Sequence, residues 1–300
     1  MKKIILDMDT GIDDAMAIAL AISNPNFDIL GFTTTFGNVS TKKSVENTLT
    51  ILSLLNREDI PVFLGEEGFN GDVYKPSEYV KGIHGANGLG NVSFPKPNKS
   101  VQAESAVSFI SRMIKKYQKK LTIVTTGTLT NLASVYKKDP SLISLTGKVV
   151  VMGGALATRG NVSELAEANI YKDIEGAKFV YSLSLDITQI GLDVTEQLKL
   201  SKSDIDKWRK SERGELFATM VSFYIDYHKT GECFLHDPAA VAYLFDNTLF
   251  QDEYFPLCIS DEGRTYMDID RGKRVNVPLH VDKTKAEEVI KKGISSVLMP

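Results

Sequence analysis

Short apolar segments alternate with helical patterns through the first two thirds of this 300-residue chain, and this alternation constrains the fold more than any other feature. Strands that are joined through helices usually lie parallel, and the helices pack against the sheet. A parallel sheet is buried on both faces, so helices should cover both. The expected strands lie near residues 4–6, 29–35, 62–64, 121–126, 148–154 and 186–192, and the expected helices span 13–23, 41–55, 101–118, 129–138 and a segment after Asp173.

The sequence changes character after Ser201, where polar helical patterns predominate. An aromatic-rich helix is expected over 217–228, an apolar helix over 240–245, a hairpin around 261–263 and a closing helix over 285–294. No internal repeat or low-complexity run interrupts the chain. The sequence therefore predicts an α/β fold in one domain, residues 1–300: a single open, mostly parallel twisted sheet with helices on both faces, plus a helical elaboration in the carboxyl half.

Four acidic residues gather where the first expected strand ends: Asp7, Asp9, Asp13 and Asp14, with Gly11 between them. Like charges this close repel and are costly to desolvate, so a cation, a substrate or protons should compensate them. In an open α/β sheet the carboxyl edge of the strands is where ligands bind. Helix capping accounts for Asp13 or Asp14 alone. The cluster therefore predicts a site for a hard metal ion.

Composition narrows the classes of partner. The formal net charge is -3 and the pI is near 5.9, which leaves no basic field for nucleic acid or an anionic membrane. No apolar stretch is long enough to span a bilayer, and the amino terminus lacks the features of a signal peptide. Cys233 and Cys258 have no partner at metal-binding spacing and are expected to be free, buried thiols. We expect a cytoplasmic protein with no nucleic-acid or membrane partner.

Two expected strands end in loops that suit a ligand site. TTGTLTN, residues 125–131, places small polar residues ahead of a helix, where backbone groups can face a ligand, although an ordinary turn capped by Thr128 or Thr130 is equally consistent. VVMGG, residues 150–154, ends in two glycines, which permit close backbone approach and also mark tight turns. Neither segment identifies a site alone.

Two further loops, over 66–98 and 157–169, are longer than ordinary connections, and loops of this length usually cover or build a site. The first contains His84; the second contains Asn161, Glu167 and Asn169, whose side chains suit the hydroxyl groups of a sugar. The later segment HDP begins with His236, which could donate a proton because imidazole titrates near physiological pH. Its aspartate could cap the following helix, bind a metal, or do both.

These motifs follow one another in an order seen in a known family. DMDTGIDD after the first strand, TTTFGN, IHGANGLG, TTGTLTN, VVMGG, AEANI and HDPAAVAY together resemble the inosine-uridine-preferring nucleoside hydrolases. The resemblance runs from residue 3 to about residue 240 and more loosely to the carboxyl terminus, and the opening aspartates combined with the late HDP are its most specific part. It implies a Rossmann-like core, and an enzyme of nucleoside salvage that hydrolyses the N-glycosidic bond of ribonucleosides to free base and ribose.

The resemblance also implies a metal ion and its ligands. Calcium would be held by Asp9, Asp14, the backbone carbonyl of Thr126 and Asp237, an all-oxygen and acid-rich set of the kind that calcium prefers. Zinc is disfavoured because neither cysteines nor paired histidines are available. Asp9 would also accept a proton from the attacking water, and His236 would protonate the leaving base.

The remaining implied residues contact the nucleoside. The substrate-binding set that the resemblance implies is Asp13, Asn38, His84, Met152, Asn161, Glu167, Asn169 and Asp237. At the base end, Gly82 replaces a histidine of purine-preferring members, and Tyr224, Tyr227 and His228 align ambiguously, which favours a mixed or pyrimidine-leaning base preference. Members of such a family are homodimers or homotetramers, and the same is expected here.

Two other classes fit part of the sequence. LDMDTG also matches the Asp-x-Asp-x-Thr signature of haloacid-dehalogenase-type magnesium phosphatases, in which Asp7 would be the nucleophile. The later lysine and paired acids of that family are missing. A non-catalytic nucleoside- or ribose-binding protein is the second alternative, and the presence of His236 with water-activating acids argues against it.

Overall fold

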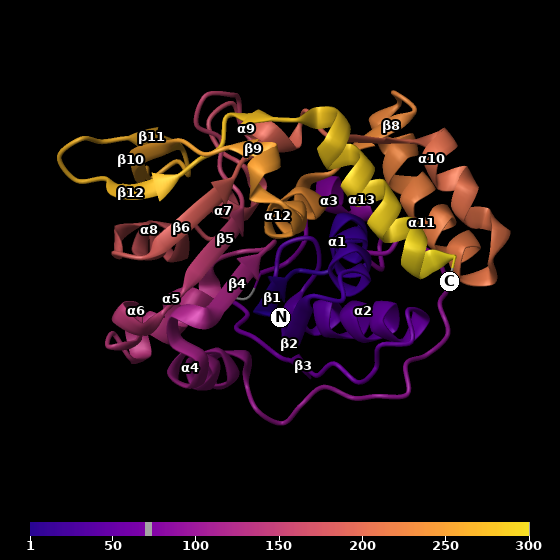
Figure 1. Ribbon diagram of the computed structural model, residues 1–300, viewed down its shortest axis with the longest axis horizontal. Helices are drawn as coiled ribbons and strands as arrows, with labels where there is room; N and C mark the ends of the chain where they lie inside the picture. Colours follow the sequence, from indigo (N-terminus) through magenta and orange to yellow (C-terminus); the bar gives the residue numbers. More distant parts are fainter. Residues whose placement is uncertain (70–73, 300) are drawn as a thin grey trace.

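The computed structural model describes residues 1–69 and 74–299 and has an α/β fold built on one large sheet (Figure 1). The strand order is β11-β10-β12-β6-β5-β4-β1-β2-β3. Neighbours from β12 to β3 run parallel, whereas β10 is antiparallel to both β11 and β12. The strands are β1 (Lys2–Met8), β2 (Phe27–Thr34), β3 (Val62–Phe63), β4 (Leu121–Thr125), β5 (Lys148–Met152), β6 (Asp186–Ile190), β10 (Tyr254–Ile259), β11 (Thr265–Met267) and β12 (Lys273–Asn276).

Helices cover both faces of the sheet, and a further helical group lies at one end (Figure 1). They are α1 (Ile12–Ser23), α2 (Thr41–Leu54), α3 (Glu78–His84), α4 (Ala106–Tyr117), α5 (Thr130–Lys138), α6 (Leu142–Leu145), α7 (Ala168–Lys172), α8 (Ile174–Ser182), α9 (Leu192–Thr195), α10 (Lys202–Asp206), α11 (Glu212–His228), α12 (His236–Phe245) and α13 (Lys283–Leu298). Single 3-10 turns are η1 (Gln118–Lys120), η2 (Lys207–Lys210) and η3 (Asn247–Leu249). Two small antiparallel pairs join β7 (Lys199–Ser201) to β8 (Glu232–Phe234) and β9 (Phe250–Gln251) to β13 (His280–Val281).

The central strands divide their side chains between two hydrophobic cores. In β1, Ile4 and Leu6 belong to the core shared with α1, α12 and α13, whereas Ile5 belongs to the core shared with α4, α5 and α8. In β5, Val150 and Val151 divide in the same way. This alternation follows from the two-residue period of a strand, and it confirms the predicted burial of the sheet on both faces.

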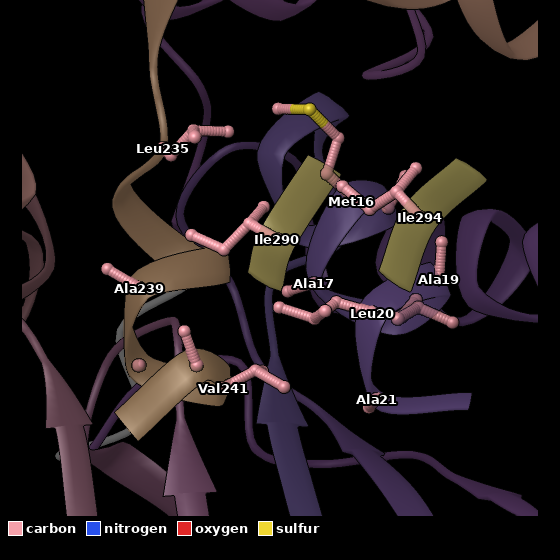
Figure 2. Packing of buried hydrophobic residues seen from close by; sticks show 14 of the residues in the cluster. Met16, Ala17, Ala19, Leu20, Ala21, Leu235, Ala239, Val241, Ile290 and Ile294 are labelled. Atoms are coloured by element: carbon pink, nitrogen blue, oxygen red, sulfur yellow. The ribbon is translucent and has the colours of Figure 1, made fainter. Parts of the chain in front are cut away.

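Helix α1 packs against both α12 and α13, and Met16 and Leu20 share one hydrophobic core with Val241 and Ile290 (Figure 2). Alanines along α1 leave room for close contact between the helices. A Cβ at Gly293 of α13 would lie 2.5 Å from Leu20 Cδ1, so that glycine permits the approach. This packing fixes the amino-terminal ends of α1 and α12 next to each other.

The structure confirms the predicted alternation and corrects several details. The expected helix over 101–118 begins at Ala106, after Ser105 caps it by accepting a hydrogen bond from the backbone N–H of Ser108 at 3.3 Å. The long 66–98 loop contains α3, whose start Ser77 caps in the same way. The predicted hairpin is present between β10 and β11, but with β12 it extends the main sheet, which the sequence did not indicate.

Two expectations drawn from the composition can be compared with the structure. Cys233 and Cys258 are free thiols, as expected; Cys233 is buried, whereas Cys258 is only partly buried because it lies on β10 near the edge of the sheet. In the parts of the chain that the structure describes, every helix is too short or too polar to cross a membrane.

Candidate active site

The aspartates of the first segment lie at the carboxyl edge of the sheet. β1 runs between β2 and β4, with Asp7 level with Thr33 on one side and Thr125 on the other. Asp9 follows the strand, and Gly11 ends the loop that leads into α1. A Cβ at Gly11 would lie 2.6 Å from His84 Nδ1, so only glycine lets the two loops meet here.

Asp7 is a buried structural carboxylate. Its Oδ1 accepts hydrogen bonds from Thr33 Oγ1 at 2.6 Å and from Asn131 Nδ2 at 2.7 Å, which tie β1 to β2 and α5. Its side chain is fully buried and does not line the pocket described below. Burial raises the pKa of Asp7 to about 6, against the lowering effect of both hydrogen bonds. A nucleophile must reach its substrate, so this position does not suit the phosphatase alternative.

Three carboxylates meet at the junction of α1 and α12. One oxygen from each of Asp13, Asp14 and Asp237 lies within 4.8 Å of the others, and all three side chains are buried. Asp14 is held in place by the backbone N–H of Gly11 at 2.8 Å and by Thr126 Oγ1 at 2.6 Å. Among the described residues, Asp237 Oδ2 has no hydrogen-bond partner. The start of α12 has no side-chain cap, and Asp237 lies in its first turn.

Asp9 lies beside this trio and is linked to Asp14 through the side chain of Asn38. Its Oδ2 accepts a hydrogen bond from the backbone N–H of Asn38 at 2.6 Å, and its Oδ1 lies 3.3 Å from Asn38 Nδ2. The ammonium of Lys172 lies 3.6 Å from Asp9 Oδ2. The structure thus gathers Asp13, Asp14 and Asp237 most closely, whereas the expected metal set contained Asp9 in place of Asp13.

Burial and mutual repulsion raise the pKa values of all four carboxylates. Burial is the larger cause for each, and a neighbouring aspartate is the second: Asp14 for Asp9, Asp9 for Asp13, and Asp13 for both Asp14 and Asp237. Lys172 partly offsets the repulsion at Asp9. Burial opposes the charged form of Lys172 itself, but Asp9 and other acids raise its pKa above the usual value. The cluster therefore carries more negative charge than its surroundings compensate.

One pocket opens above this cluster and brings together most of the expected substrate residues. It is lined by Asp13, Asn38, His84, Thr126, Met152, Asn161, Glu167, Asn169, His236 and Asp237 from the expected set. Asp9 and Asp14 lie behind this lining, each within hydrogen-bond distance of Asn38. Residues that the chain separates by more than 200 positions therefore share one cavity.

The side of the pocket formed by α7 is held by side-chain contacts to the backbone. Glu167 caps α7, and its carboxylate accepts hydrogen bonds from the backbone N–H groups of Gly154, Asn169 and Ile170 at 2.9–3.1 Å. Asn169 Nδ2 donates to the carbonyl of Thr126 at 2.8 Å, the carbonyl that was expected to bind the metal. Asn161 Oδ1 accepts from the backbone of Ala168. These polar groups border the cavity but also hold the loop in place.

Both expected histidines are neutral at pH 7. Burial lowers the pKa of His84 to about 3, and its Nδ1 faces the backbone N–H of Ile12 at 3.3 Å. Burial, assisted by His228, lowers the pKa of His236 to about 4. His236 Nδ1 lies 2.8 Å from Thr195 Oγ1. When that hydroxyl donates to Nδ1, the ring proton lies on Nε2, which can then donate a hydrogen bond to a ligand.

An aromatic wall closes the other side of the pocket. Tyr224, Tyr227 and His228 come from one face of α11, at the spacing that places residues together on a helix. Tyr79 of α3 meets Tyr227 edge to face at 6.3 Å, and Phe234 meets His228 at 5.5 Å. The sequence identified these three α11 residues as candidates but did not show where they lie relative to the substrate. The sequence reasoning missed the lining residues Tyr79, Val80, Ile83, Val162, Ala168, Lys172, Glu196 and Phe234.

The acid cluster predicts an unusual pH dependence for the metal-free protein. Because the pKa is raised to about 7 for Asp14 and about 8 for Asp9, the folded protein holds protons that the unfolded chain has released. This stabilisation is present at pH 6.5 and is lost as the pH rises to 8. The buried histidines oppose this effect in part: His84 and His236 are neutral when folded, whereas in the unfolded chain each loses about half a proton as the pH rises from 6.5 to 8, which favours folding less strongly than the two aspartates oppose it.

We expect the melting temperature in a chelator to fall by about 2–5 °C between pH 6.5 and pH 8. Scanning calorimetry would measure it. A saturating divalent cation should flatten the dependence, because the cation then compensates the carboxylates in place of protons. A melting temperature that is constant or rises over this window without metal would contradict the raised pKa values.

Comparisons with known proteins agree with this geometry. The family model described as inosine-uridine preferring nucleoside hydrolase matches residues 4–288. The chain belongs to this family. It is 40% identical over 256 residues to uridine nucleosidase 1 of Arabidopsis thaliana, covering 83% of this chain and 75% of that protein. It is 34% identical over 254 residues to the pyrimidine-specific ribonucleoside hydrolase RihA of Escherichia coli, covering 82% and 80%.

A solved nucleoside hydrolase has the same fold over its whole length. The purine-preferring ribonucleoside hydrolase from Gardnerella vaginalis superposes with a TM-score of 0.95, covers 99% of both chains and is 37% identical. As a nucleoside hydrolase, this chain is an enzyme of a metal-dependent family that cleaves the N-glycosidic bond of ribonucleosides. The residues fit a hard cation: three buried carboxylates converge, and one oxygen of Asp237 has no partner among the described residues.

Proposed function

We propose that this enzyme hydrolyses both purine and pyrimidine ribonucleosides to free base and ribose, with calcium as its metal. The observation that carries the proposal is the acid trio Asp13, Asp14 and Asp237 beneath a pocket with one polar side and one aromatic side. A ribose fits the chemistry of the polar side, and a planar base fits that of the aromatic side. The N-glycosidic bond would then lie between them, above the acids.

Calcium is favoured by the chemistry of the donors. The ligands would be carboxylate oxygens of Asp9, Asp14 and Asp237 and the carbonyl of Thr126, with Asp13 alongside. Oxygen donors with several negative charges suit calcium, and the trio contains neither a histidine nor a cysteine. A bound divalent cation would compensate the buried charge and lower the pKa of a water molecule next to it.

The chain's own residues supply the remaining chemistry. Asp9, whose pKa burial raises, would accept a proton from the attacking water. Cleavage develops positive charge on the ribose ring, and the carboxylates around the site favour that charge. Asp13, Asn38, Asn161, Glu167 and Asn169 would hold the ribose hydroxyls, and Met152 would line the sugar end.

At the other end of the bond, His236 would donate the Nε2 proton to the leaving base. Nδ1 of the same ring lies 2.8 Å from Thr195 Oγ1, and this contact would hold the ring in place. Because burial lowers the pKa of His236 to about 4, the protonated ring that gives up this proton is a minor form of the free enzyme at pH 7, and the bound nucleoside would have to stabilise it.

A broad base preference is supported by the shape of the aromatic wall. Tyr224 and Tyr227 can stack on either class of base, because every base has an aromatic face. His228 Nε2 is buried without a hydrogen-bond partner among the described residues, so it is free to contact a base edge. The relatives compared above include uridine, pyrimidine-specific and purine-preferring enzymes. We further propose that residues 1–300 act as one domain and that the enzyme is a homodimer or homotetramer.

A reducing-sugar assay tests the proposal directly. Ribose release from inosine, uridine and cytidine would be measured with calcium, with a chelator, and after calcium is restored. We expect release from all three nucleosides, at least a 100-fold loss in the chelator and recovery with calcium. Release that persists in the chelator would remove the metal from the proposal. Binding of nucleoside without release would replace hydrolysis with a binding function.

A further inference from the structure

Lys172 is a buried cation in the pocket wall that the chemistry above does not use. It is the last residue of α7, and its side chain is 7% exposed. Its Nζ lies 3.2 Å from Asn38 Oδ1 and 3.6 Å from Asp9 Oδ2. A buried ammonium is costly unless its charge is compensated and its hydrogen bonds are made, so both contacts matter to the fold of the site.

The contact with Lys172 determines how the Asn38 amide is oriented. An ammonium only donates hydrogen bonds, so the amide atom facing Lys172 must be the oxygen. The amide nitrogen then faces two carboxylates, at 3.3 Å from Asp9 Oδ1 and 3.1 Å from Asp14 Oδ2. In this orientation the amide oxygen faces a hydrogen-bond donor and the amide nitrogen faces acceptors. Lys172, Asn38 and Asp9 therefore form one chain of polar contacts.

The loop that carries Asn38 is shaped for this network. A Cβ at Gly37 would lie 2.0 Å from Asp9 Oδ2 and 3.1 Å from Lys172 Cδ. Any larger residue at this position would push Asp9 and Lys172 apart. The backbone N–H of Asn38 also donates to Asp9 Oδ2 at 2.6 Å, so the same residue holds both oxygens of the carboxylate.

We propose that Lys172 is a positioning residue that acts through Asn38. It holds the Asp9 carboxylate in the orientation needed to accept a proton, and its charge competes with the metal for Asp9. The proposal rests on the proposed function. It has two consequences that separate it from a role in folding alone: loss of Lys172 should lower kcat rather than raise KM, and it should tighten calcium binding.

The test compares Lys172→Met, Asn38→Ala and the double variant, with Lys138→Met as the matched control, because Lys138 is exposed on α5. We expect Lys172→Met to lower kcat about 10- to 100-fold while KM changes less than about threefold. The double variant should be no slower than the slower single variant, because the two residues act as one unit. Lys172→Arg, which keeps the charge and the donors, should recover most of kcat. Losses of kcat that multiply in the double variant would overturn the proposal.

Calcium titration of the metal-free protein by calorimetry gives a readout that needs no turnover. Removing the ammonium should tighten calcium binding about 5- to 30-fold in Lys172→Met and leave Lys138→Met unchanged. Unchanged or weaker calcium binding in a folded Lys172→Met variant would overturn the proposal. If Met is not tolerated, Lys172→Gln removes the charge and keeps a polar group. Should the wild type release no ribose, the proposed function fails, whereas this titration still tests whether Lys172 competes for Asp9.

Discussion

Replacing Asp9 with Asn should lower kcat for ribonucleoside hydrolysis by about 10³-fold or more, because a general base alone contributes 10²- to 10⁴-fold. The amide keeps the shape of the side chain but cannot accept a proton from water at neutral pH. It also removes one negative charge from the proposed metal set. Steady-state kinetics with uridine and inosine at saturating calcium would measure the loss.

Asp7→Asn is the matched control for this experiment. Asp7 is two residues earlier, on strand β1, and is as buried as Asp9, but it contacts Thr33 and Asn131 rather than the pocket. An Asn at this position can still accept both hydrogen bonds, so the folded variant should keep kcat within about threefold of the wild type. If Asp7→Asn were inactive and Asp9→Asn active, the assignment of Asp9 as the general base would be wrong.

Asp237→Asn should have opposite effects on metal binding and on the stability of the metal-free protein. Losing one carboxylate beside a divalent cation should weaken calcium binding by about 10³-fold. Without metal, the substitution removes a carboxyl group that the fold must bury either protonated or as a charge, since burial raises its pKa and its Oδ2 has no partner among the described residues. The melting temperature of the metal-free variant should therefore rise by about 2–6 °C at pH 8.

Calcium titration and scanning calorimetry on the same preparation would measure both effects. Asp246→Asn serves as the control, because Asp246 lies exposed just past the other end of α12. It should change neither calcium binding nor the melting temperature appreciably. A metal-free Asp237→Asn variant that melts well below the wild type would show that Asp237 stabilises the fold, and would count against a carboxylate kept for its metal.

The sequence predicted the parts of this structure that depend on local patterns. The apolar runs at Ile4–Ile5 and Val149–Val151 predicted central strands because both faces of such strands are buried. The position of Asp9 after the first strand predicted a site at the carboxyl edge. The resemblance correctly identified the family, because seven short motifs in fixed order are far more specific than any one of them.

Other parts depend on contacts between distant segments and could not be predicted. Asp13 faces Asp237 rather than solvent because α1 and α12 pack together, which no local pattern reports. In the sequence, Lys172 has the pattern of an ordinary lysine at a helix end. Only the structure shows its contact with Asn38 from a distant loop. Glu167 was predicted for its chemistry toward a sugar; in the structure it also caps α7 and accepts a hydrogen bond from the backbone N–H of Gly154 in another loop.

The contact between α1 and α12 also sets the order in which the enzyme can become competent during synthesis. Asp13 and Asp14 are translated well before Asp237, which follows more than 220 residues later. Until α12 has docked, the early acids face each other without their third partner, and the cation that would neutralise them has an incomplete set of ligands. Closing so long a loop is slow compared with forming local helices. A divalent cation would therefore bind tightly only after α12 has been made and docked, and its affinity would report that this part of the fold is complete.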